Sequence, residues 1–335
     1  MLPVRIKGTG IYAPGEAINN EELKKLAGID FDAEKAENKL GIYRRHIARL
    51  RGINETTADF ATRAAEAALK DAGIDAGEVG LLIVATDTPE YISPSTAIVV
   101  QGRLQGEEKW TASFDVNASC ASFAIALDMT VNQLYARDDL TYALVIGVYN
   151  MPAFIRPDDA FGWSIFADGA GAFVLEKNRD TQSGYIGGIQ LTDGTQWNFI
   201  GIYSGGSRNP ITHEMLDNQQ YGLQNLKPLP GDRNVRLWPM VAEKAFEKFG
   251  MQAVDIDHFL FTQINRSVIE KVMEVLEQPL SKTTCIMQDF GYTGSGCIPM
   301  AFHQAIKNGN IQRGNKVMLI ASGAGLAVGC NLLVY

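Results

Sequence analysis

Residues 66–84 read EAALKDAGIDAGEVGLLIV, and residues 243–261 read EKAFEKFGMQAVDIDHFLF. Both stretches pass from a helical pattern through a glycine turn into an apolar strand, and a shift of 177 positions places them in step. The same shift puts Cys120 on Cys297, each at the start of a helix with one apolar side. Any two α/β units share part of this pattern, but the matching order favours a duplication. We therefore predict an α/β protein built from two similar halves related by a pseudo-twofold axis.

Apolar segments alternate with helical patterns along the chain, as is typical of α/β proteins with buried strands. The patterns predict strands at Val79–Thr86, Thr111–Val116, Thr141–Val148, Ala172–Glu176, His258–Gln263 and Lys316–Ser322, and helices at Thr57–Ala72, Cys120–Ala136 and Val241–Phe249. Residues 193–239 carry many Gly, Asn and Pro, so we expect surface loops there. No Pro-rich or Ser-rich linker divides the chain, and we expect residues 1–177 and 178–335 to pack into one body.

The composition limits the class of protein. The 335 residues are 46% hydrophobic and 20% charged, which is typical of a globular protein. A formal charge of −8 repels phosphate backbones and argues against nucleic acid as a partner. The chain has no apolar run long enough for a secretory signal or a membrane span, so we expect a cytoplasmic protein without a membrane partner. Four scattered cysteines and four histidines favour neither a disulfide framework nor a metal site.

Cys120 is the first candidate for chemistry, because it lies in FDVNASCASFAIALDM (114–129) between an apolar strand and a helical pattern. The free amides and partial positive charge of a helix's first turn favour a thiolate, which is the nucleophilic form. The small residues around it leave room for a substrate carbonyl. The alternative is a structural cysteine packed as a small apolar residue, and the residues alone leave both interpretations open.

Five segments carry a resemblance to a known family: FDVNASCASF (114–123), FADGAGAFVL (166–175), LGIYRRHIA (40–48), ISPS (92–95) and SGAGLAVG (322–329). They resemble motifs of the β-ketoacyl-acyl carrier protein synthase III family of thiolase-fold condensing enzymes, and the likeness runs nearly end to end. The resemblance implies a thiolase-like duplicated five-layer αβαβα sandwich and a homodimer. It also implies that Cys120 takes an acyl group from coenzyme A, which is then condensed with malonyl on an acyl carrier protein.

Two family motifs are altered in this chain. The family's HQAN motif matches Thr262–Asn265, so Thr262 stands where the family has its catalytic histidine. The GNTS motif matches Gly291–Gly294, and Tyr292 stands in place of the asparagine. In the family both side chains donate hydrogen bonds to the malonyl thioester oxygen, and losing one such donor costs about 100- to 1,000-fold in rate. The resemblance therefore predicts inefficient decarboxylation unless the Thr262 and Tyr292 hydroxyls replace the donors.

The resemblance assigns further roles to individual residues. The backbone N–H groups of Cys120 and Gly325 would form the oxyanion hole. The run Arg44, Arg45, Arg49 and Arg51 makes either a positive patch suited to phosphates or a solvated helical or loop face. We assign Arg44, Arg156 and Asn265 to substrate binding. The aromatic residue that stacks on adenine in many members has no clear match in residues 30–39, which leaves coenzyme A as donor open. No permanently bound cofactor is expected, and the histidines are expected to be structural, His213 being the one considered for the site.

Three functional hypotheses follow from these residues. The first is an acyltransferase in which Cys120 accepts an acyl group from a coenzyme A or carrier-protein thioester and passes it to an alcohol, amine or thiol. The second is a decarboxylative 3-oxoacyl synthase that uses Thr262 and Tyr292 as donors. The third is a catalytically silent partner of a related synthase. The retained Cys120 favours the first two, because a purely structural subunit needs no nucleophile.

Overall fold

A computed structural model describes residues 1–107, 109–178 and 182–335. The first of its two large sheets has five strands, in the order β1 (Val4–Tyr12), β7 (Asp168–Lys177), β6 (Tyr142–Asn150), β4 (Val79–Ala85) and β5 (Ala112–Val116). Strand β4 is parallel to β5 and β6, whereas β7 is antiparallel to both β1 and β6. The second sheet has four strands, in the order β8 (Gly184–Gln196), β13 (Gly325–Val334), β12 (Lys316–Gly323) and β11 (His258–Phe261).

The two sheets repeat the same strand order and directions. In the second sheet β11 is parallel to β12, and β13 is antiparallel to both β12 and β8. Strands β8, β11, β12 and β13 thus correspond to β1, β4, β6 and β7. A single parallel bridge between Phe259 and Thr283 lies where the counterpart of β5 would pair.

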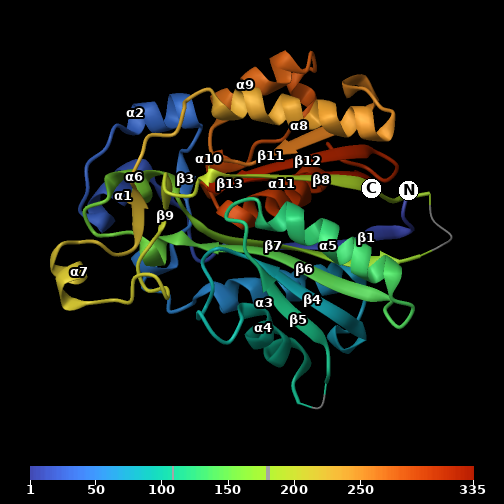
Figure 1. The fold of residues 1–335 in the computed structure, drawn as a ribbon, viewed down its shortest axis with the longest axis horizontal. Helices are drawn as coiled ribbons and strands as arrows, with labels where there is room; N and C mark the ends of the chain where they lie inside the picture. The colour runs from blue at the N-terminus through green and yellow to red at the C-terminus, as the bar shows by residue number, and fades with distance from the viewer. Residues whose placement is uncertain (108, 179–181) are drawn as a thin grey trace.

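Helices form three layers around these sheets. Helices α3 (Thr57–Ala72) and α4 (Thr96–Gln105) pack on the first sheet, and α8 (Arg233–Phe249) packs on the second and against α9 (Arg266–Val275). Helices α5 (Ser122–Ala136) and α11 (Cys297–Lys307) lie between the sheets (Figure 1). The predicted duplicated five-layer αβαβα sandwich is therefore confirmed.

The glycine turn that defines the sequence repeat has the same conformation in both halves. Gly73 ends α3 with φ +67° and Gly250 ends α8 with φ +64°, a left-handed conformation that favours glycine. A short turn then leads into β4 in one half and β11 in the other. The local sequence thus fixes the junction on which the prediction of two halves rests.

Most predicted elements are confirmed, and the differences concern their bounds. The patterns missed three strands altogether: β1 and β8, whose glycines and mixed exposure obscure a strand signal, and the largely buried β13. Helix α5 begins two residues after Cys120, and α8 begins eight residues before the predicted start. The shorter elements are β2 (Ile18–Asn19), α1 (Asn20–Ala27), α2 (Ala33–Lys35), β3 (Arg44–Arg45), α6 (Ala160–Ile165), β9 (Ile200–Ile202), α7 (His213–Asp217), β10 (Leu223–Asn225) and α10 (Met287–Phe290).

The expectation of surface loops at 193–239 is wrong in part. This stretch holds the end of β8, the β9–β10 pair, α7 and the start of α8. Strands β9 and β10 have only three residues each, so their stability depends on what they cover and not on a local pattern. In the part of the chain that the structure describes, no helix has both the length and the apolar character needed to cross a bilayer.

Candidate active site

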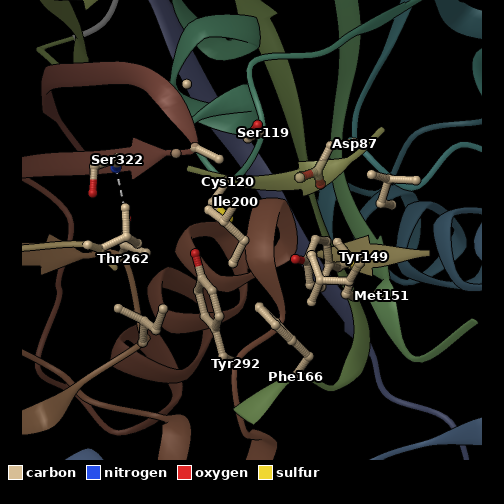
Figure 2. A pocket seen from close by; sticks show the side chains of 18 of the residues that line it. Asp87, Ser119, Cys120, Tyr149, Met151, Phe166, Ile200, Thr262, Tyr292 and Ser322 are labelled. Carbon is tan, nitrogen blue, oxygen red and sulfur yellow. Dashed lines mark hydrogen bonds between the residues drawn. The ribbon is translucent and has the colours of Figure 1, made fainter. Parts of the chain in front are cut away.

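The candidate site lies where strands of both sheets end. A cavity of about 320 Å³ opens there, within the size range of small-molecule sites. The first sheet places Asp87 after β4, Cys120 after β5 and Tyr149 near the end of β6. The second sheet contributes Thr262 directly after β11 and Ser322 near the end of β12 (Figure 2). Loops at the carboxyl ends of parallel strands are the usual ligand sites of α/β sheets.

A tight turn presents Cys120 to the cavity. Ser119 has φ +51°, an uncommon conformation for a residue other than glycine. The Ser122 hydroxyl accepts a hydrogen bond from the Ala118 N–H at 2.8 Å and donates one to the Ser119 carbonyl. Ser295, from the second half, also donates to that carbonyl at 3.2 Å. The turn is thus fixed from both halves, and the half-buried Cys120 thiol lines the cavity.

The predicted preference of Cys120 for the thiolate form is wrong for this state of the site. Burial raises the pKa of the Cys120 thiol above its ordinary value, and the nearby Asp87 carboxyl raises it further. Hydrogen bonds from the Tyr292 and Tyr149 hydroxyls lower the pKa but do not offset the desolvation. Helix α5 begins at Ser122, so Cys120 is not part of its first turn. Cys120 is therefore a protonated thiol at neutral pH, and its reaction needs a group that accepts the proton.

Alkylation with iodoacetamide should reveal this raised pKa. The rate at Cys120 should increase about tenfold per pH unit from about pH 7 to 10, because only the thiolate reacts. Mass spectrometry of the Cys120 peptide measures the rate, with unfolded protein as the control for an ordinary thiol. A plateau below about pH 8.5 would contradict the raised pKa.

Tyr149 and Tyr292 supply hydroxyl donors beside the sulfur. Burial raises the pKa of both phenols well above the ordinary value, so both remain protonated. The Tyr292 N–H donates to the Ile165 carbonyl at 3.0 Å, which fixes its backbone. Gly294 has φ +41°, and a Cβ there would lie 2.3 Å from the Tyr149 ring, so glycine makes room for that ring. In Figure 2 both hydroxyls are directed toward the region of Cys120.

Thr262 and Gly325 bring the second half into the site. Thr262 is buried, and its hydroxyl accepts a hydrogen bond from the Ser322 N–H at 2.9 Å (Figure 2). The Trp238 indole N–H donates to the Ser322 hydroxyl at 3.1 Å and so supports this arrangement. Gly325 lines the same cavity as Cys120, as do Thr262 and Tyr292. The structure therefore brings the four sequence-predicted catalytic residues together; their individual roles stay predictions.

The four histidines lie elsewhere. His46 contacts the Pro14 and Gly15 carbonyls, His258 pairs with Thr284 at 2.9 Å, His303 pairs with Thr9 at 2.9 Å, and His213 is exposed at the start of α7. Within the described ranges, no histidine belongs to the cavity lining. The same residues contain no cluster of three His, Cys, Asp or Glu side chains that could hold a metal ion.

The arginine run does not form one exposed patch. Arg44 is exposed and forms an ion pair with Asp289 at 2.7 Å. Arg45 is fully buried, and its guanidinium donates to the Asn20 side chain at 2.6 Å and to the Ser164 carbonyl at 2.9 Å. A charge pattern in the sequence cannot distinguish such a buried, hydrogen-bonded arginine from a solvated one. Phosphate binding by Arg44 stays a prediction, whereas Arg45 is not available to it.

Arg156 and Asn265 lie outside the residues that line the cavity. Arg156 donates to the Leu223 carbonyl at 2.6 Å and to the Tyr221 carbonyl at 3.3 Å, and so holds β10. The Asn265 side chain caps α9 by accepting from the Val268 N–H at 3.3 Å. Both residues have these structural contacts, and their roles in binding substrate stay predictions.

Sequence reasoning missed several lining residues, among them the polar Asp87, Tyr149, Tyr203, Arg233, Asn234 and Ser322. Asp87 and Tyr149 adjoin strands that the sequence did predict, so the rule that parallel strands present their carboxyl ends to ligands could have found them. Arg233 lies in the stretch wrongly expected to be loops. The apolar part of the lining consists of Met151, Phe166, Trp197, Ile200, Ile202, Leu223, Leu229 and Ile264. This lining suits an apolar chain whose reactive end reaches Cys120.

Comparisons with known proteins agree with this geometry. Residues 114–194 match the family model described as 3-oxoacyl-[acyl-carrier-protein (ACP)] synthase III, and residues 246–335 match the model of its C-terminal part. The chain is 34% identical over 335 residues to a beta-ketoacyl-[acyl-carrier-protein] synthase III of Neisseria meningitidis serogroup B (strain MC58), covering 100% of both chains. It is 34% identical to an acetoacetyl CoA synthase of Streptomyces sp. (strain CL190), covering 99% of this chain and 98% of that one. The 3-oxoacyl-[acyl-carrier-protein] synthase III structure from Aquifex aeolicus VF5 matches with a TM-score of 0.85 and 29% identity, covering 99% of this chain and 100% of that one.

Proposed function

Because this chain belongs to the 3-oxoacyl-[acyl-carrier-protein] synthase III family of acyltransferases, we propose that Cys120 accepts an acyl group and passes it to an acceptor without efficient decarboxylation. The acyl donor is a coenzyme A or carrier-protein thioester. The observation that carries the proposal is the composition of the cavity. It combines a cysteine, three phenols, a threonine and an apolar wall, and among its described lining residues there is no histidine.

Acylation requires a nucleophile and donors for the oxyanion. The Cys120 sulfur lines the cavity at the end of the apolar wall. Gly323 packs so closely on the nucleophile turn that a Cβ there would lie 2.9 Å from the Cys120 nitrogen. The end of β12 therefore lies beside the Cys120 amide, and Gly325, two residues further on, lines the same cavity. This supports an oxyanion hole formed by the Cys120 and Gly325 N–H groups. This half-reaction uses only groups present in the cavity.

Decarboxylation of malonyl thioester makes a different demand. It needs donors fixed on the thioester oxygen, and each is worth about 3–4 kcal/mol. Thr262 and Tyr292 occupy the positions matched to the family's histidine and asparagine. The Thr262 hydroxyl already accepts a hydrogen bond from the Ser322 N–H. A hydroxyl can donate a hydrogen bond, but unlike imidazole it does not change its protonation state near neutral pH. We therefore expect transfer to a heteroatom acceptor to outpace carbon–carbon bond formation.

Incubation with a panel of acyl-coenzyme A thioesters tests the first half-reaction. Intact mass should increase by one acyl group with at least one donor, and peptide mapping should place that group on Cys120. Release of labelled carbon dioxide from malonyl thioester, measured in parallel, should be at least about 100-fold slower than acylation. The absence of an adduct with every coenzyme A and carrier-protein donor would overturn the proposal.

A decarboxylative synthase is the second candidate, and the presence of the Tyr292 phenol in the same cavity lining as Cys120 favours it. A phenol at that position could donate a hydrogen bond to the oxygen of a bound thioester. Under this candidate, carbon dioxide release keeps pace with acylation and falls in Tyr292→Phe. Under the leading proposal, release is slow in both proteins.

The proposal extends to the assembly and to location. We expect a homodimer, as the resemblance implies, and a cytoplasmic location. In support, β5 forms an edge of the five-stranded sheet, and Trp110 and Ile98 beside it are exposed. A silent partner subunit has the least support, because a nucleophile in an open cavity serves no structural purpose.

A further inference from the structure

Asp87 is a carboxyl group in the cavity to which no step described above assigns a role. It follows β4, which is parallel to the neighbouring β5 that leads to Cys120. Its Oδ1 atom is buried and has no hydrogen-bond partner among the residues that the structure describes. An unpaired buried acceptor is costly, so its retention in a reactive cavity points to a ligand or a proton. In Figure 2 Asp87 and Tyr149 lie on the same side of Cys120.

Asp87 differs in kind from the other ionisable groups of the lining. These groups are Asp87, Cys120, Tyr149, Tyr203, Arg233 and Tyr292. The pKa values of all three tyrosines are raised, and Arg233 remains protonated, so these groups can donate but cannot accept a proton. Burial raises the pKa of Asp87 to about 6, which leaves it ionised at neutral pH. The titratable groups it acts on electrostatically are Cys120 and Tyr149.

We propose that Asp87 is the general base that activates the acceptor, a hydroxyl or amine compound, in the second half-reaction. This inference rests on the proposed acylation of Cys120. A lone pair of the acceptor attacks the thioester carbonyl carbon while its proton moves to Asp87 Oδ1. The carbon–sulfur bond then breaks, and Asp87 passes that proton to the departing Cys120 thiolate. An ester or amide is released, and both side chains return to their starting states without another co-reactant.

The test compares acceptors that differ in their need for a base. Wild type, Asp87→Asn and Asp87→Glu are acylated by prolonged incubation with octanoyl-coenzyme A, or with whichever panel member gives the adduct. Loss of the acyl group is then followed by intact mass in water, in ethanol and in hydroxylamine. Asp87→Asn should slow release to water and ethanol by at least about 100-fold. Hydroxylamine is a much stronger nucleophile than water or ethanol and depends less on a base, so its release rate should fall much less, and Asp87→Glu should recover part of the loss.

The pH dependence of acyl release distinguishes a base from a residue with a structural role, because a structural role of Asp87 would produce no inflection in the release rate. In wild type, release to water should fall about tenfold per pH unit below about pH 6, because the protonated carboxyl cannot accept a proton. Asp87→Asn should lack this inflection. Because Tyr149, Tyr292 and Arg233 do not titrate in this range, an inflection near this pH is attributed to Asp87.

The outcomes separate this inference from the proposed function. A wild type that forms no adduct contradicts the proposed function. An adduct whose release is unchanged in Asp87→Asn, or whose release in wild type is independent of pH between about 5 and 8, overturns the role of Asp87 alone. If Asp87→Asn fails to fold or to become acylated, the wild-type profile and Asp87→Glu decide the question.

Discussion

Cys120→Ala should abolish formation of the acyl adduct and lower acyl transfer by at least about 1,000-fold. The substitution removes the sulfur that lines the cavity and leaves the surrounding phenols and amides in place. None of the remaining lining groups is a good nucleophile at neutral pH, because the phenols stay protonated and the Thr262 hydroxyl is an alcohol. Intact mass after incubation with the active donor measures the adduct, and product formation measures the transfer.

Cys285→Ala is the matched control for this substitution. Cys285 is also half-buried and free, but it lies outside the cavity lining, and burial raises its pKa to about 11. The Cys285→Ala variant should form the acyl adduct and transfer the acyl group at the wild-type rate. An adduct that persists in Cys120→Ala would place the nucleophile elsewhere and remove the basis of the acyl-enzyme mechanism. Thermal unfolding of both variants near the wild-type temperature excludes misfolding as the cause of a loss.

Sequence periodicity predicted the strands that build the site, but not how the site works. The repeat of 66–84 at 243–261 predicted two matching halves, because local helix, turn and strand signals are the same in both. The protonation of Cys120 depends on burial and on its distance from Asp87, neither of which a linear pattern contains. The sequence showed a helix after Cys120, but only the structure shows that this helix begins two residues later.

The wall of the cavity was not predictable for a related reason. Strands β9 and β10 have three residues each and pair mainly with one another, so no long periodic pattern marks them. They exist because Ile200, Ile202 and Leu223 cover an apolar cavity made by other parts of the chain. Arg45 gives the converse case, since a charged run in the sequence suggested a solvated face and the structure buries it completely.

Gly323→Ala tests whether the nucleophile turn depends on the second half of the chain. A Cβ at Gly323 would lie 2.6 Å from the Ala118 carbonyl oxygen and 2.9 Å from the nitrogens of Cys120 and Ala121. All three atoms belong to backbone, so they cannot move aside as a flexible side chain would. Overpacking of this kind costs about 1–3 kcal/mol in the free energy of unfolding, which urea denaturation measures. Because relief requires the Cys120 turn to shift away from Gly325, acylation should fall by about 100-fold or more, as for a lost oxyanion donor.

Gly102→Ala separates this local effect from the general effect of replacing glycine. Gly102 lies inside α4, where a Cβ would meet no atom within 4 Å, so alanine should stabilise the protein by about 0.5–1 kcal/mol. Acylation of Cys120 should remain at the wild-type rate in this variant. If Gly323→Ala acylates as fast as Gly102→Ala, the second half does not hold the nucleophile turn in place. The duplication would then explain the architecture of the protein but not the alignment of its thiol with the amide donors.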